Sequence, residues 1–146
     1  MSDILPFVGG MVPAASNEAH EKIERLIDAM KSLDAPKPDI KIHQMLHAGC
    51  YVRTAFFPKD TIMASCQLLV PTVLIVSGDC VITDTERTVR IQGYEVLTGA
   101  RMRQGIIRTL KDTYMTAFFA TDAKTTQEAE AQSVADVSQL YRDQGA

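Results

Sequence analysis

The chain has 146 residues and a formal net charge of −3, and 46% of its residues are hydrophobic. This length predicts one domain with a proper core, and the small net charge argues against nucleic-acid binding through a basic surface. No apolar run approaches the roughly 18 residues of a membrane span, and no basic flank precedes the N-terminal apolar stretch, so we expect a protein that is neither exported nor membrane-bound. The three cysteines, an odd number, are expected to be free thiols in a reducing compartment.

Residues 1–15 form an apolar arm with two prolines, two adjacent glycines and no periodicity. A free tail would be more polar, so we expect the arm to lie against its own domain or a partner. We assign a partner contact to Ile4, Leu5, Phe7 and Val8.

A helix is predicted over residues 16–35. Ser16 or Asn17 can cap it, and its apolar residues recur at helical spacing. These residues are Ile23, Leu26, Ile27, Met30 and Leu33. The two prolines in residues 34–39 end the helix.

Short apolar segments separated by turn residues occupy residues 40–122. The predicted strands are 51–57, 61–70, 73–76, 80–82, 88–91, 94–97, 105–110 and 113–120. This spacing is typical of a mainly β, antiparallel sandwich or jelly roll. The segment 77–79 is interpreted as a hairpin tip.

A second helix is predicted over residues 125–143, flanking the same single domain. Thr125 and Glu128 form a capping-box pattern. A narrow apolar stripe follows, made of Val134, Val137, Leu140 and Tyr141.

His43, His47 and Cys50 are the best metal candidates, because zinc accepts imidazole and thiolate ligands. The histidine spacing suits a helix, however, whereas this segment leads into a strand, and no fourth ligand lies nearby. We therefore interpret these residues as edge or loop residues, and assign no metal, cofactor or catalytic residue. A cysteine nucleophile is also disfavoured, because Cys66 lies within an apolar strand.

The basic cluster Arg101, Arg103, Arg108 and Lys111 has two interpretations. It is either a solvated connection between strands or a contact that pairs arginine with carboxylates of an acidic partner. We assign the partner contact to Arg101 and Arg103.

Two phenylalanine pairs indicate association, because adjacent strand residues face opposite sides. In Phe56–Phe57 and in Phe118–Phe119, one ring fills the core. The other ring must be covered by a helix, the arm or another subunit.

Several segments together resemble small cupin-like proteins encoded in tailed phages and prophages. They are Tyr51-Val52-Arg53, Pro58, Thr61, Ser77-Gly78, Lys111-Asp112-Thr113, Thr116 and Thr121-Asp122. The likeness covers roughly residues 17–130 and implies a cupin-like barrel. Histidines of that family tend to follow the second strand and to precede the end of the last. The corresponding segments here, 66–70 and 117–120, contain none, so we expect an interior packed with Leu, Val, Met and Phe.

The resemblance implies a structural role, similar to the jelly-roll decoration or cement proteins of phage heads. We expect a homodimer that is made in the host cytoplasm and binds the major capsid protein at the virion surface, without nucleic-acid or membrane partners. One alternative is a metal-binding cupin-type enzyme or sensor that uses His43, His47 and Cys50. Another is a jelly roll that binds a small ligand or a sugar, against which the absence of tryptophan counts.

Overall fold

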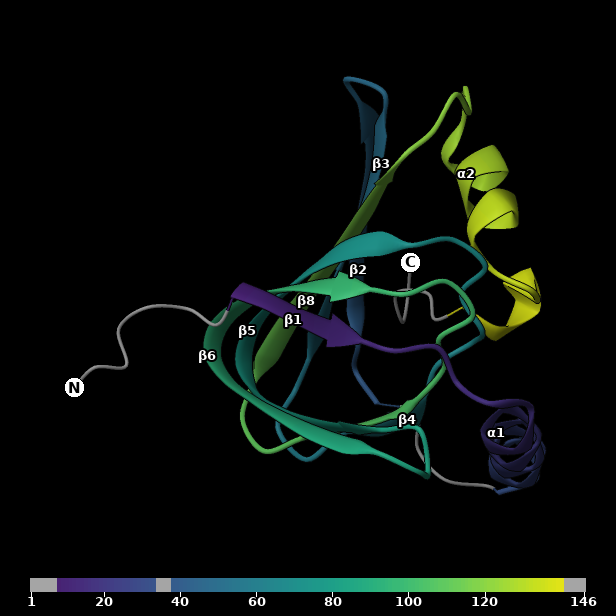
Figure 1. Ribbon diagram of the computed structural model, residues 1–146, viewed down its shortest axis with the longest axis vertical. Coiled ribbons are helices and arrows are strands. Elements are labelled where there is room, and N and C mark those ends of the chain that lie inside the picture. Colours follow the sequence, from purple (N-terminus) through teal and green to yellow (C-terminus); the bar gives the residue numbers. More distant parts are fainter. Residues whose placement is uncertain (1–7, 34–37, 141–146) are drawn as a thin grey trace.

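The computed structural model describes residues 8–33 and 38–140 (Figure 1). The elements are β1 (Val8–Val12), α1 (Asn17–Lys31), β2 (Lys41–His47), β3 (Cys50–Phe57), β4 (Ile62–Ala64), β5 (Thr72–Thr83), β6 (Thr88–Gly99), β7 (Ile106–Thr109), β8 (Thr113–Ala120), α2 (Thr126–Ser133) and a short 3-10 helix (Val137–Gln139). In these ranges no helix has the length and apolarity needed to cross a membrane. Ile4, Leu5 and Phe7 lie outside the described residues, so their assignment stays a prediction.

The strands form one mixed sheet in the order β1-β6-β5-β8-β3-β2, and β7 pairs with both β5 and β4. The expected mainly β, jelly-roll-like architecture is confirmed. The described pairings among β2 to β8 are antiparallel, whereas β1, from the predicted arm, runs parallel to β6. The expected antiparallel barrel is not confirmed, because the sheet is mixed and the pairings among described residues do not close a ring. β1 reaches the sheet edge without a hairpin to its neighbour, so no tight turn imposes the antiparallel direction.

Residues 77–79 lie inside β5 and do not form the expected hairpin tip. Residues 73–76 and 80–82 therefore belong to one strand, whose first half pairs with β8 and whose second half pairs with β7. Gly78 lies where the partner changes, with φ of 149°. A β-carbon there would overlap Thr113 Oγ1 and lie 2.7 Å from the Asp112 carbonyl oxygen. Glycine allows this close approach of two backbones.

We expect Gly78→Ala to lower the free energy of unfolding by about 2–3 kcal/mol, because strain and overlap both contribute. Gly93 is the matched control, since it lies opposite Gly78 in the β5–β6 pair. Its φ is also positive, at 78°, but a β-carbon would meet no atom within 4 Å. Gly93→Ala should therefore cost only about 1 kcal/mol. Urea denaturation of both variants measures the difference, and equal losses would contradict this account of Gly78.

Tertiary pairing explains the other departures from the sequence-based prediction. Residues 41–47 form a full strand along β3 instead of a loop. Of the predicted strand 61–70, only Ile62–Ala64 is a strand. The helix predicted over 125–143 ends at Ser133, because Val134 is extended and bridges Leu68. Its residues 141–143 lie outside the described part of the chain.

The buried core lies between the inner faces of the strands and includes Val76, Ile91 and Leu97. Helix α1 begins after Ser16, whose side chain accepts a hydrogen bond from the Ala19 amide. Figure 1 shows α1 beside β4, at one end of the sheet. There Ile23 and Ile27 pack against Ala64 and Ile106 in a second, smaller cluster.

Candidate functional site

A cavity of about 210 Å³ opens beside the core, so the interior is packed with Leu, Val, Met and Phe only in part. Its wall is mainly apolar and includes residues of all eight strands. The apolar residues that line it include Ile42, Ala55, Phe57, Met63, Leu74, Ile82, Ile107, Met115 and Ala117. Ala55 and Ala117 are small side chains on neighbouring strands, which leaves space that larger residues would fill.

Arg53 lines this cavity and is paired with a carboxylate. Its Nη1 donates to Glu130 Oε2 of helix α2 over 3.2 Å, and only 5% of Glu130 is exposed. The sequence carries a signal for this inward arginine. Strand alternation places Arg53 on the same side as Tyr51 and Phe57, which are both buried.

Arg103 also lines the cavity and is 8% exposed. Its Nη1 donates to the Ala100 carbonyl over 3.2 Å, and its guanidinium lies over Gly99, where a β-carbon would come within 2.6 Å of Cζ. Among described residues, no carboxylate oxygen lies within 4.0 Å of it. Burial lowers the pKa of Arg103 to about 10, which still leaves it charged at neutral pH.

The structure therefore separates the two arginines that were assigned together. Arg101 is exposed on the turn, as expected for a surface contact, whereas Arg103 is buried. Hydrogen bonds join Leu68 N to Arg103 O and Met102 N to Leu68 O, and so hold this segment against the chain before β5. This pairing between distant segments has no signal in the sequence.

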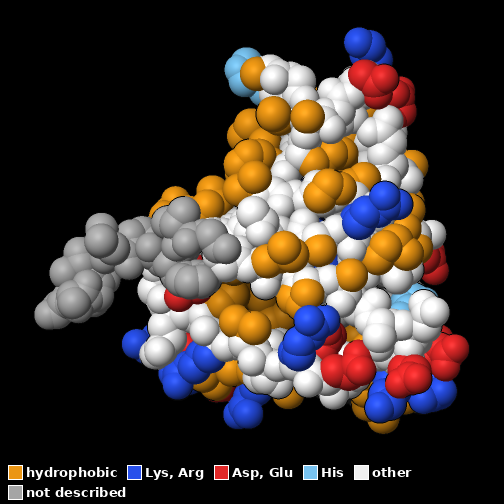
Figure 2. Space-filling model, in the orientation of Figure 1, with side chains coloured by type: hydrophobic (Ala, Val, Ile, Leu, Met, Phe, Trp, Pro, Cys, Tyr) orange, Lys and Arg blue, Asp and Glu red, His pale blue; other side chains and the backbone are white. Residues whose placement is uncertain are grey.

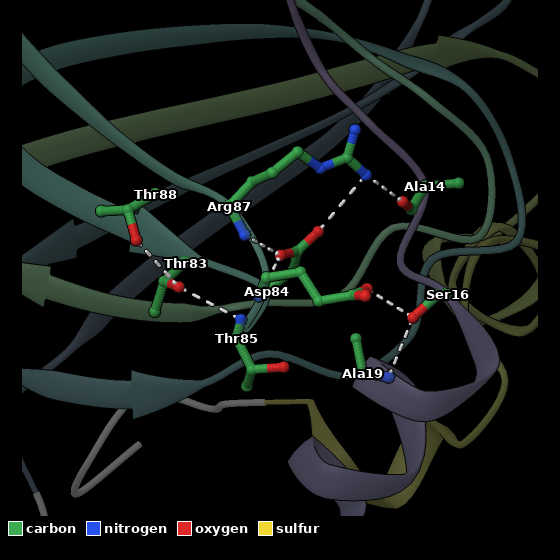
Figure 3. Close-up of polar contacts among 9 residues, drawn as sticks. Ala14, Ser16, Ala19, Thr83, Asp84, Thr85, Arg87 and Thr88 are labelled. Atoms are coloured by element: carbon green, nitrogen blue, oxygen red, sulfur yellow. Dashed lines mark hydrogen bonds and ion pairs between the residues drawn. The ribbon is translucent and has the colours of Figure 1, made fainter.

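A polar rim borders the cavity where the β5–β6 turn meets the chain before α1 (Figure 3). Asp84 accepts hydrogen bonds from the amides of Glu86 and Arg87. Arg87 also reaches the Asp84 carboxylate at 3.5 Å and the Ala14 carbonyl at 3.1 Å. Burial by itself raises the pKa of Asp84. The two amides and the Arg87 guanidinium lower this pKa by more than burial raises it, so the net shift is downward. The rim therefore holds an ionised carboxylate that forms an ion pair with Arg87, while its buried Oδ2 has no hydrogen-bond partner among the described residues.

Gln104 connects the opposite part of the cavity wall to helix α1. Its side-chain nitrogen donates to Glu24 Oε2 over 2.7 Å and to the Ser65 carbonyl over 3.1 Å, and its oxygen contacts His20 Nδ1. Gln139 donates to the other oxygen of Glu24 over 3.2 Å. Gln104 is 4% exposed, and these contacts satisfy both ends of its amide.

The donor set does not fit a metal centre in the cavity. The lining thiol, Cys66, has its pKa raised to about 11 by burial, so it stays protonated, and Asp84 is held by Arg87. Arg103 adds positive charge, which would repel a cation. In the part of the chain that the structure describes, no three His, Cys, Asp or Glu side chains lie close enough together to hold a metal ion.

The structure places the earlier metal candidates at the rim of the sheet. His43 and His47 are exposed on one face of β2, and His47 pairs with Cys50 across the β2–β3 hairpin. The inward face of β2 carries Ile42, which lines the cavity. Because alternate strand residues face opposite sides, the two histidines point away from the cavity.

The outer face of the sheet carries a broad apolar surface. By register, Tyr94, Ser77, Tyr114 and Phe56 form one row across four strands. A second row on the same face starts at Val73 on β5. It continues through Phe118, Val52 and Met45 on β8, β3 and β2. Tyr94 and Tyr114 are 51% and 54% exposed. Phe56 contacts Tyr114 with ring centroids 4.9 Å apart, whereas Phe57 is buried in the core, so this pair does place one ring on each face.

The fold is cupin-like. The structure is similar to a cupin superfamily protein from Desulfitobacterium hafniense, with a TM-score of 0.50, 14% identity, and coverage of 62% of this chain and 84% of that one. It also resembles salicylate 1,2-dioxygenase from Pseudoaminobacter salicylatoxidans, with a TM-score of 0.50, 12% identity, and coverage of 80% of this chain and 33% of the dioxygenase. The cupin domain of Schizosaccharomyces pombe Cnp3 gives a TM-score of 0.47, 14% identity, and coverage of 70% and 73%.

At these identities the likeness concerns the fold alone. No protein-family model matches the sequence, and no curated protein matches it either.

Proposed function

We propose that this chain is a non-catalytic binding protein that holds a small, largely apolar molecule in its internal cavity. The observation that carries the proposal is the 210 Å³ cavity, whose wall is built mainly from apolar side chains of the eight strands. Concave, mostly apolar sites with a few polar groups are typical of small-molecule binding sites. The missing tryptophan argues against a sugar, which supports an apolar ligand.

Binding can be tested with 1-hexanol, benzyl alcohol and indole as neutral probes. Methyl spectra of methionine-labelled protein report the site, because Met63 and Met115 line the cavity while Met11 and Met45 are exposed. We expect at least one probe to shift the Met63 and Met115 signals saturably, with a Kd of roughly 10 µM to 1 mM for ligands of this size. The signals of Met11 and Met45 should stay in place. If no probe shifts the cavity signals, the proposed function is wrong.

The outer sheet face favours a second proposal, the structural role of a cement protein on a tailed-phage head. Its six strands span roughly 24 Å by about 23 Å, or about 550 Å², which is about two thirds of the ~800 Å² per partner of a standard interface. The two rows through Ser77 and Val73 carry no acidic side chain. Such an apolar face can contact the same face of a second copy in an isologous interface, which supports a homodimer. The resemblance of residues 17–130 to phage proteins supports the major capsid protein as the further partner.

The copy number of the chain in purified virions of the encoding phage tests this second proposal. A fixed ratio to the major capsid protein is the expected result, and absence from particles would refute the capsid role. Deleting residues 2–7 separates the arm from β1, which begins at Val8. If the arm makes the capsid contact, this deletion should abolish binding while the fold stays intact.

A further inference from the structure

We infer that the cavity ligand is a small organic monocarboxylate, whose apolar part fills the cavity and whose carboxylate pairs with Arg103. This inference rests on the proposed binding function and names the chemical class of its ligand. It goes beyond an apolar site because one charged group on the cavity wall, Arg103, has no counter-charge among the residues that the structure describes.

The charges at the cavity are balanced except at one position. Arg53 pairs with Glu130, and Arg87 pairs with Asp84. Just outside the cavity, Arg90 pairs with Asp79 through two hydrogen bonds of 3.0 and 2.8 Å. Arg103 is the remaining arginine on the cavity wall, and within the described residues it has no carboxylate partner. A buried cation is costly unless it is paired and hydrogen-bonded, so a ligand that brings an anion would supply the missing charge.

Arg103 is also held in place for such a contact. Its backbone oxygen accepts from the Leu68 amide over 2.9 Å, and its guanidinium lies against Gly99, which has no side chain to displace it. The planar guanidinium offers parallel N–H donors that match the two oxygens of a carboxylate. The hydrogen bond to Ala100 uses Nη1, which leaves donors on the other nitrogens for a ligand.

A second polar group without a partner lies at the same place. Thr72 is opposite Gly99 in the β5–β6 pair, so its side chain is on the face of the sheet that the Arg103 guanidinium covers. Thr72 is 7% exposed, and its Oγ1 has no hydrogen-bond partner among the described residues. Buried hydroxyls are normally satisfied, so the wall near Arg103 holds polar capacity that the described residues do not use. Arg103 lines the cavity and Thr72 does not, so the direct contact is assigned to Arg103.

The size of the cavity limits the acid. Its 210 Å³ lies below the ≈ 300–1,000 Å³ that is typical of ligand pockets, so only a small molecule fits. The remaining wall is mainly apolar. A short aliphatic acid or a single-ring aromatic acid satisfies both limits, whereas a dicarboxylate would place its second charge against apolar side chains.

The test compares acids with alcohols of the same skeleton, namely hexanoate with 1-hexanol and benzoate with benzyl alcohol. Calorimetry and the Met63 and Met115 methyl signals measure binding to the full chain at pH 7. We expect each carboxylate to bind at least tenfold more tightly than its alcohol. Arg103→Met should remove this preference while retaining alcohol binding. Arg101→Met is the matched control, because Arg101 is exposed two residues away, and it should retain the preference.

The outcomes separate this inference from the proposed function. If the alcohols bind as well as the acids, the cavity binds ligands but the carboxylate assignment is wrong. If neither series binds, the proposed function fails as well. Arg103→Met should unfold at the same or higher urea concentration than wild type, because an apolar side chain replaces a buried unpaired charge. Arg103→Lys provides a second variant, which keeps the charge without the bidentate geometry and should show an intermediate preference.

Discussion

Glu130→Ala is expected to lower the free energy of unfolding by about 3–5 kcal/mol, because it removes one partner of a buried ion pair. Glu130 is 5% exposed, and its carboxylate accepts from Arg53 over 3.2 Å. The pair also joins helix α2 to strand β3, and its two residues are 77 positions apart in the sequence. Chemical denaturation at neutral pH measures the loss.

The exposed pair between Lys41 and Asp39 is the control, with the two side chains 54% and 67% exposed. Asp39→Ala should change stability by less than about 0.5 kcal/mol, because water screens such pairs. The double variant Arg53→Met, Glu130→Leu should recover most of the loss, since apolar residues of similar volume replace both charges. A double variant as unstable as Glu130→Ala would show that the charge is not the cause.

Ala117→Leu is expected to weaken ligand binding roughly a hundredfold, about 2.8 kcal/mol, while raising the free energy of unfolding by about 0.5–2 kcal/mol. Ala117 lines the cavity and lies opposite Leu74 on β5. An isobutyl group there would occupy the space of the ligand and restore lost packing contacts. Opposite changes in binding and stability distinguish a filled cavity from a damaged fold.

Ala120→Leu is the matched control on the same strand. Ala120 is exposed and pairs with Cys50, at the end of β8, so the added group should leave binding of the probes unchanged. Ala55→Val is a second variant that lines the cavity from β3. It should weaken binding in the same direction but less, because it adds less volume. Unchanged binding in both cavity variants would place the ligand elsewhere.

Glu130→Ala and Arg103→Met concern different uses of buried charge in this molecule. Arg53 is neutralised by Glu130 and therefore contributes to stability through α2. Arg103 is buried without such a partner among the described residues, so it is expected to cost stability. An arrangement that costs stability at a cavity wall is typical of a site shaped for a ligand. Comparing Glu130→Ala with Arg103→Met therefore separates structural from functional arginines.

Local patterns were sufficient for part of the fold. The caps and apolar spacing of residues 16–33 predicted helix α1, and Thr125 does cap helix α2. The alternation of residues 51–57 predicted strand β3 and that one ring of the Phe56–Phe57 pair lies in the core, which is Phe57. These features depend on neighbours within a few residues, so the sequence displays them directly.

The sequence pattern failed where contacts between distant segments decide the structure. Gly78 indicated a turn, yet the approach of the β7–β8 connection, at Asp112 and Thr113, keeps it within a long strand. Val134 fits the helical stripe, but pairing with Leu68 makes it extended. Arg103 resembles the neighbouring exposed Arg101 in sequence, and only its packing over Gly99 and beside Leu68 makes it part of a cavity.

The amino-acid sequence by itself indicated helix α1, most of the strands and the mainly β, jelly-roll class, because periodicity, caps and turn residues act over short distances. The cupin-like class came from the resemblance of several segments to a known family. The tertiary structure decided where the strands exchange partners, that the interior is hollow and which arginine remains unpaired. A cavity forms where the side chains of the surrounding strands leave space unfilled, and a buried charge stays unpaired where those strands bring no opposite charge near it. Both features depend on how several distant strands pack together, so no single segment of the sequence reveals them.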